Sequence, residues 1–148
     1  LHSSIIMPVK YKLIQRRDMS KGALEDAKLY YAQAVSTGYM TFDELCDEIS
    51  EACALTSADI KAVMDRMNHV LDKNLKAGRI VQFGEIGNFR MTVGSSGSAT
   101  IEDFNADTML RKPKITFSPG SFLQNTRTLA KFERLTIKEN QTEEPTEP

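Results

Sequence analysis

Two helix-start signals in the middle of the chain constrain its fold more than any other feature. Residues 41–44 and 56–59 each begin with threonine and place an acid three residues later, which is the pattern of a capping box. An apolar stripe at helical spacing follows each box, and Gly78 stands where the second helix would end. The stripes are Phe42, Leu45, Cys46, Ile49, Ala52 and Cys53, then Ile60, Val63, Met64, Met67, Leu71 and Leu75. Because two such helices cannot bury their stripes alone, we expect a homodimer.

The charge of the chain is segregated, although its formal total is only −1. Residues 7–40 carry six lysines and arginines against three acids, whereas residues 41–77 carry eight acids against four bases. Residues 117–138 are basic, and residues 139–148 hold four glutamates and no base. A basic face can therefore attract a polyanion even though the whole chain is nearly neutral. Its apolar runs are far shorter than the roughly 20 residues that span a bilayer, so we expect no membrane association.

Strand patterns flank the two helices. Residues 9–16 alternate apolar and basic side chains, and residues 30–35 and 132–137 resemble further short strands. Residues 23–29 are compatible with a helical turn. Residues 1–8 are interpreted as an added or disordered start, and residues 139–148 as a disordered acidic tail.

A β-hairpin and a short helix are predicted after the second helix. Gly84 and Gly87 permit a tight reversal between residues 79–83 and a strand over residues 88–93. Another strand is expected over residues 114–117. Ser118 as the N-cap and Pro119 at the first helical position then predict a helix over residues 120–129.

The sequence offers no constellation for catalysis. Cys46 and Cys53 are expected in one helix, about 10 Å apart by helical rise, and so cannot form a disulfide with each other. With His2 and His69 as the only further soft ligands, one chain cannot assemble a zinc site. We predict that the protein is not an enzyme and uses no cofactor, metal or small-molecule substrate.

The order of these elements resembles the HU/IHF family of bacterial histone-like proteins. Two helices are followed by Gly84-Glu85-Ile86-Gly87-Asn88-Phe89, by 27 intervening residues, and by Phe117-Ser118-Pro119-Gly120. That separation is close to the one the family uses for its DNA-embracing β-arm. The added strands before residue 41 and after residue 131 are similar to those of the elaborated HU-like proteins of the Bacteroidetes type.

The resemblance implies an α+β fold and a function. The fold is an N-terminal helical hairpin, a three-stranded antiparallel sheet with a long β-arm and a short C-terminal helix, assembled as an intertwined dimer. The expected organisation is a β extension over residues 9–40 and an HU-like domain over residues 41–138. The implied function is architectural binding of double-stranded DNA in the minor groove with little sequence preference, in the cytoplasm on the nucleoid.

Four cations are expected at the base of the arm, where they would contact phosphates: Arg90, Arg111, Lys112 and Lys114. The arm departs from the family in lacking the Arg-Asn-Pro tip, and its centre carries Glu102, Asp103 and Asp107 instead. Phe104 could act as a wedge between bases or pack on the protein itself. The acids leave an alternative open, in which an HU-fold scaffold has lost strong DNA binding and acts through protein contacts.

Overall fold

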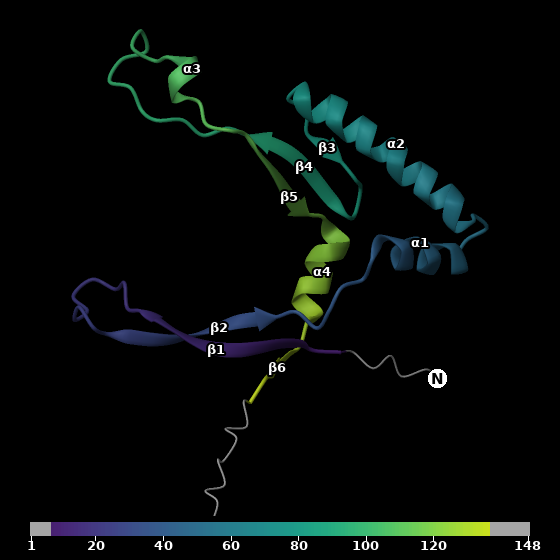
Figure 1. Ribbon diagram of the computed structural model, residues 1–148, viewed down its shortest axis with the longest axis horizontal. Coiled ribbons are helices and arrows are strands. Elements are labelled where there is room, and N and C mark those ends of the chain that lie inside the picture. Colours follow the sequence, from purple (N-terminus) through teal and green to yellow (C-terminus); the bar gives the residue numbers. More distant parts are fainter. Residues whose placement is uncertain (1–6, 137–148) are drawn as a thin grey trace, which may run out of the picture. The chain divides into compact units, whose positions relative to one another are not determined.

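The computed structural model of this chain describes residues 7–136, and its elements fall into two units that are described separately (Figure 1). One unit draws on Leu1–Tyr39 and Ala130–Pro148, and the other spans Met40–Leu129. Most of the predicted start and the whole acidic tail lie outside the described residues. No helix in the described range is long and apolar enough to cross a membrane.

The first unit is a small sheet built from both ends of the chain. Strand β1 (Val9–Arg17) pairs antiparallel with β2 (Lys28–Val35) and parallel with β6 (Phe132–Arg134), which gives the order β2-β1-β6. The expected strands at the two ends of the chain therefore pair with each other. Residues 132–134, which were predicted to be part of an HU-like domain over residues 41–138, pair with β1 in this unit.

The connection between β1 and β2 does not contain the helical turn considered for residues 23–29. Two short hydrogen bonds close it instead, from Asp18 N–H to the Ala27 carbonyl at 2.7 Å and from Ala27 N–H to the Leu24 carbonyl at 3.0 Å. Strand β2 then begins at Lys28. Pairing in the hairpin uses the backbone N–H and C=O groups that a helical turn would need for its own hydrogen bonds.

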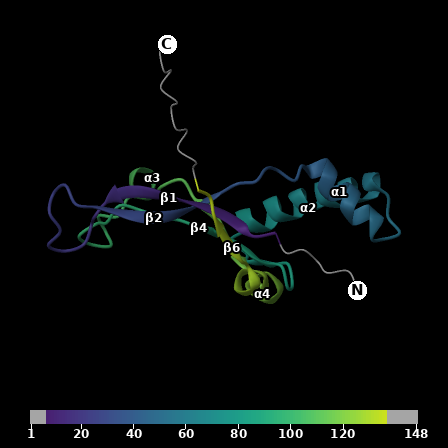
Figure 2. The ribbon, with the colours of Figure 1, turned by 90° about the horizontal axis from the view of Figure 1, so that it is seen from below.

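In the second unit, both helices begin at the predicted capping boxes. Helix α1 (Phe42–Glu51) is capped by Thr41, and helix α2 (Ser57–Lys76) by Thr56. The two helices pack on each other, and Figure 2 shows them side by side from a second direction. Because α1 ends at Glu51, Cys53 lies beyond the helix and is exposed, contrary to the expectation that both cysteines share one helix.

The capping box of α2 predicts a measurable loss of stability. Asp59 N–H donates to Thr56 Oγ1 at 3.2 Å, and the Thr56 hydroxyl and N–H donate back to Asp59 at 2.8 and 3.0 Å. Thr56→Ala should lower the free energy of unfolding by about 1 kcal/mol, or about 2–4 °C of thermal midpoint. Ser96→Ala, at an exposed position outside the helices, is the control. A Thr56→Ala protein with the midpoint of the parent would contradict a stabilising cap.

The same hydrogen bonds give a pH dependence with a definite sign. Those from the Thr56 hydroxyl, and then from its N–H, hold the pKa of the Asp59 carboxyl below its ordinary value. A carboxyl with a lowered folded pKa stabilises the fold above its unfolded pKa and loses that contribution as the pH falls through the folded value. In Asp59→Asn, the free energy of unfolding should therefore fall less steeply as the pH is lowered through and below the ordinary pKa range of an aspartate.

The second sheet contains β3 (Val81–Gln82), β4 (Gly87–Thr92) and β5 (Lys114–Pro119) in the antiparallel order β3-β4-β5. The predicted hairpin at Gly84 and Gly87 is confirmed, with both glycines at positive φ and Phe83 N–H donating to the Gly87 carbonyl at 2.8 Å. Phe89 stacks against Phe83 and Phe117, at centroid distances of 5.3 and 5.0 Å. One face of this sheet is therefore aromatic.

Helix α4 (Ser121–Leu129) begins later than its sequence signal indicates. Pro119 is not the first helical residue, because it is the last residue of β5 and pairs with Gly87. Gly120 N–H then donates to the Ile86 carbonyl at 2.7 Å. The sheet thus extends through the predicted capping serine, Ser118, and delays the helix.

Candidate nucleic-acid interface

The β4–β5 pairing separates the sheet into a polar face and an apolar face. Arg90 pairs with Thr116, and Lys114 with Thr92, whereas Phe89 pairs with Phe117. Because successive side chains alternate across a strand, Arg90 and Lys114 share the face opposite the phenylalanines. They are diagonal neighbours on adjacent strands, which places them roughly 7–8 Å apart. The structure therefore brings two of the predicted cations together on one surface.

Arg111 and Lys112 lie just before β5, in the segment that returns to the sheet. Arg111 N–H donates to the Gly94 carbonyl at 2.9 Å, and an isolated bridge joins Ser95 to Leu110. All four predicted cations, Arg90, Arg111, Lys112 and Lys114, are exposed. Within residues 7–136 none of them forms an ion pair, so their charge is available to a ligand.

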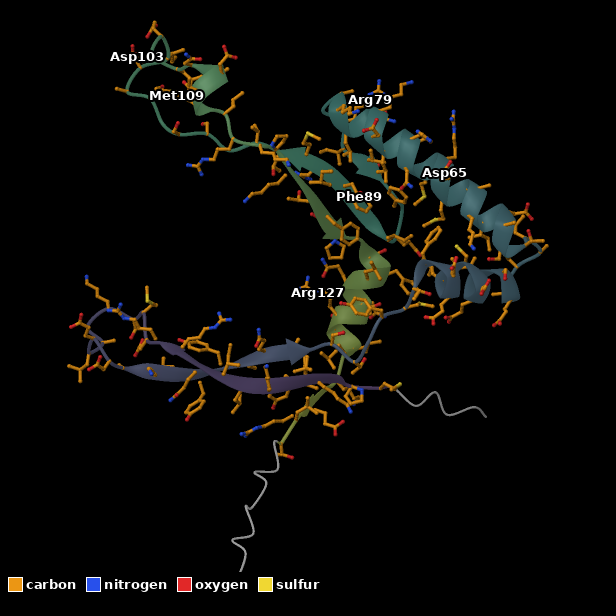
Figure 3. All side chains as sticks on the ribbon, in the orientation of Figure 1. Asp65, Arg79, Phe89, Asp103, Met109 and Arg127 are labelled. Carbon is orange, nitrogen blue, oxygen red and sulfur yellow. The ribbon has the colours of Figure 1, made fainter. Side chains whose placement is uncertain are left out.

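The segment beyond this base is not the long β-arm expected from the sequence. The pairing continues as far as Ser96, whose N–H donates to the Met109 carbonyl at 3.1 Å beside the Ser95–Leu110 bridge. Residues 106–109 then form a single turn of helix, α3 (Ala106–Met109). Asn105 caps this turn by accepting a hydrogen bond from Asp107 N–H at 3.0 Å. Local capping by an asparagine outweighs strand pairing here. Figure 3 shows Asp103 and Met109 in this segment, beyond the end of the β4–β5 ladder.

The tip of this segment is acidic and partly apolar. Glu102, Asp103 and Asp107 are exposed there. Phe104 is 39% exposed and lines a shallow pocket of about 470 Å³ with residues 98–101 of the same segment. The cations of the candidate interface are thus at its base, and the acids are at its tip.

A further cationic cluster on α2 was not assigned from the sequence. Arg66, His69 and Lys73 line a shallow pocket of about 260 Å³ with Val70 and Asn74. Their spacing of three and four residues places them on one helix face and was the available signal. The His69 side chain is 69% exposed, with Nε2 3.9 Å from Asp65 Oδ2.

Comparison with known families decides the classification. Residues 7–134 match the family described as an HU domain fused to wHTH, Ig, or glycine-rich motif, HU-HIG. The chain belongs to the HU-HIG family. This membership agrees with the HU/IHF resemblance of the sequence, and the mixed α/β architecture is consistent with an HU-like fold. No protein of curated description matches the HU-HIG chain significantly.

A solved structure shows the same fold at low identity. It is a crystal structure described as a "putative bacterial DNA binding protein" from Bacteroides vulgatus ATCC 8482, with 14% identity and a TM-score of 0.56. The similarity covers 86% of the HU-HIG chain and 48% of that protein, so this chain spans about half of its length.

Proposed function

We propose that this HU-HIG protein is an architectural DNA-binding protein that binds duplex DNA with little sequence preference. The observation that carries the proposal is the group of four exposed cations, Arg90, Arg111, Lys112 and Lys114, which have no ion-pair partner among the described residues. Such cations neutralise phosphates and release counterions, a contribution that carries no base information. Membership of an HU-domain family supports DNA as the polyanion, and hence a place on the nucleoid.

The proposed contact is through the minor groove, with the base of the β4–β5 segment closest to the phosphates. The acidic tip and helix α3 do not offer the cationic ribbon that deep insertion would favour. Because the tip repels phosphate, we propose weak binding, steeply dependent on salt, with little kinking of the duplex.

We also propose that the working unit is a homodimer. Among the described residues, the buried hydrophobic side chains are only Cys46, Ile60 and Leu75. By contrast Val63, Val70, Ile115 and Phe117 are 57, 44, 62 and 43% exposed. A chain of this size needs far more buried apolar surface to fold, and a second copy would supply it.

Replacing Arg111 and Lys112 with alanine tests the DNA-binding proposal. Each phosphate contact contributes about −0.9 to the slope of log K against log salt concentration. Two lost cations per protomer should therefore reduce the slope of a dimer by roughly 2 to 4, for all duplex sequences alike. The measurement is a gel-shift titration with random duplex DNA at several salt concentrations.

The matched control is Lys61→Ala with Lys76→Ala. It removes the same number of charges, but these lysines already pair with Asp43 at 2.7 Å and Asp72 at 2.9 Å. The control should bind almost as the parent does. If the Arg111 and Lys112 variant also binds like the parent, the β4–β5 segment is not the DNA-binding element. The acidic tip would then favour the second candidate function, an HU-fold scaffold that acts through protein contacts.

A further inference from the structure

The two strands of the β1–β2 hairpin carry positive charges and no negative ones. Its five strand cations are Lys10, Lys12, Arg16, Arg17 and Lys28, and neither β1 nor β2 contains a carboxylate. The acids of this segment, Asp18, Glu25 and Asp26, lie in the connecting turn. The Asp18 carboxylate accepts hydrogen bonds from the Ser20 hydroxyl at 2.6 Å and the Ser20 N–H at 2.9 Å. No strand cation forms an ion pair within the described residues.

The two faces of the hairpin differ in character. Tyr11, Leu13, Ala32, Ala34 and Phe132 line a shallow pocket of about 580 Å³, so these side chains share one face. Alternation along the strands places Lys12, Arg16 and the 42% exposed Tyr31 on the opposite face. Lys10 also lies there, but it is half-buried and pairs in register with Glu133. The free charge of this face therefore lies at Lys12 and Arg16.

Arg17 and Lys28 do not add to this charge, because the same alternation places them on the face of Tyr11 and Leu13. They are direct cross-strand partners in the β1–β2 register, and like charges in that position destabilise a strand pair. We call Lys12 and Arg16, both of which are exposed, the hairpin cations.

Protection of a strand edge is the simpler explanation for such charges. Among residues 7–136, β6 pairs only with Val9, Lys10 and Tyr11, and no other strand pairs with this edge of β1. Charged side chains discourage another strand from adding to such an edge. Edge protection accounts for a lysine on this strand. It does not require a second cation on the same face, and neither strand carries an acid that would balance the charge.

We infer that the β1–β2 hairpin is a second DNA-binding surface, at which the hairpin cations contact the phosphate backbone of duplex DNA. The inference rests on the proposed function, because it extends the DNA contact beyond the β4–β5 segment. At about 3.4 Å per residue, Lys12 and Arg16 lie about 14 Å apart along β1. That distance spans about four phosphates of one DNA strand, at 3.4 Å of helix axis each.

The test is Lys12→Gln with Arg16→Gln, titrated with random duplex DNA at several salt concentrations. We expect affinity at least about tenfold weaker near 0.1 M salt, and a salt slope smaller by about 2 to 4 for a dimer. The charge-preserving variant, Lys12→Arg with Arg16→Lys, should bind as the parent does. The thermal midpoints of both should match the parent, because the replaced side chains are exposed.

The outcomes separate this inference from the proposed function. If the glutamine variant keeps the affinity and slope of the parent while Arg111→Ala with Lys112→Ala lowers them, the hairpin surface is excluded and the proposed function stands. If the parent does not bind duplex DNA at all, the proposed function fails and the inference fails with it. If the charge-preserving variant loses as much DNA affinity as the glutamine variant, the loss comes from altered packing. That result would overturn the proposed phosphate contact.

Discussion

Val70→Asp is expected to convert the protein from a dimer into monomers. Helix α2 carries an inner apolar stripe of Ile60, Met64, Leu71 and Leu75, whose ends are buried within the chain. Val63, Met67 and Val70 form a second stripe beside it, and both valines are exposed in one copy. A valine that is exposed in the protomer tolerates aspartate there, whereas the same carboxylate would lie unpaired in a dimer interface.

The size of the effect follows from the symmetry of a dimer. A two-fold interface contains the substitution twice, and two buried carboxylates at about 2 kcal/mol or more each would weaken association on the order of a thousandfold. Sedimentation over a concentration series measures this change. Asn68→Asp is the control, because Asn68 is exposed and lies roughly 160° around the same helix from Val70. A parent that is monomeric at micromolar concentration, or a Val70→Asp variant that remains dimeric, would exclude this interface.

The helix starts could be predicted because the signals that define them are local. Thr41 accepts from Glu44 N–H and donates its own N–H to the Glu44 carboxylate, so four consecutive residues contain the whole interaction. The turn at Gly84 and Gly87 is local in the same sense. Its positive φ angles favour glycine whatever the rest of the chain does.

The elements that were predicted incorrectly depend on partners distant in sequence. Ser118 and Pro119 have the local pattern of a helix start, but pairing with Asn88 and Gly87 keeps them in β5. Conversely, the segment expected to continue the β4–β5 ladder is interrupted by the Asn105 cap and helix α3. Local and non-local interactions compete in both places, and the sequence pattern does not state which is stronger.

The candidate interface was predictable in position but not in geometry. Arg90 and Lys114 were singled out by charge alone, and only the β4–β5 register places them on the same face. The basic outer face of β1 was visible in its alternation. That Arg17 lies on the other face, directly opposite Lys28, required the β1–β2 register.

Gly87→Ala is expected to destabilise the second unit strongly. Gly87 has φ of 146°, which is strained for any residue with a side chain. A Cβ there would overlap the Ser118 carbonyl oxygen and would lie 2.7 Å from Phe117 Cε2. Both obstacles belong to β5, and the first is backbone, so neither can move aside without breaking the β4–β5 pairing that positions Arg90 and Lys114.

Such a combination of strain and overlap should lower the free energy of unfolding by about 3 kcal/mol or more, and the thermal midpoint by about 6–12 °C. Gly97→Ala is the matched control, since a Cβ there meets nothing within 4 Å. Differential scanning calorimetry of the parent and the two variants measures the free energy of unfolding and the thermal midpoint. At temperatures below its thermal midpoint, the Gly87→Ala variant should also bind DNA more weakly than the parent, because the sheet register sets the spacing of the cations. A Gly87→Ala protein with the midpoint of the Gly97→Ala control would show that β4 and β5 do not approach each other this closely, and would remove the geometric basis for placing Arg90 beside Lys114.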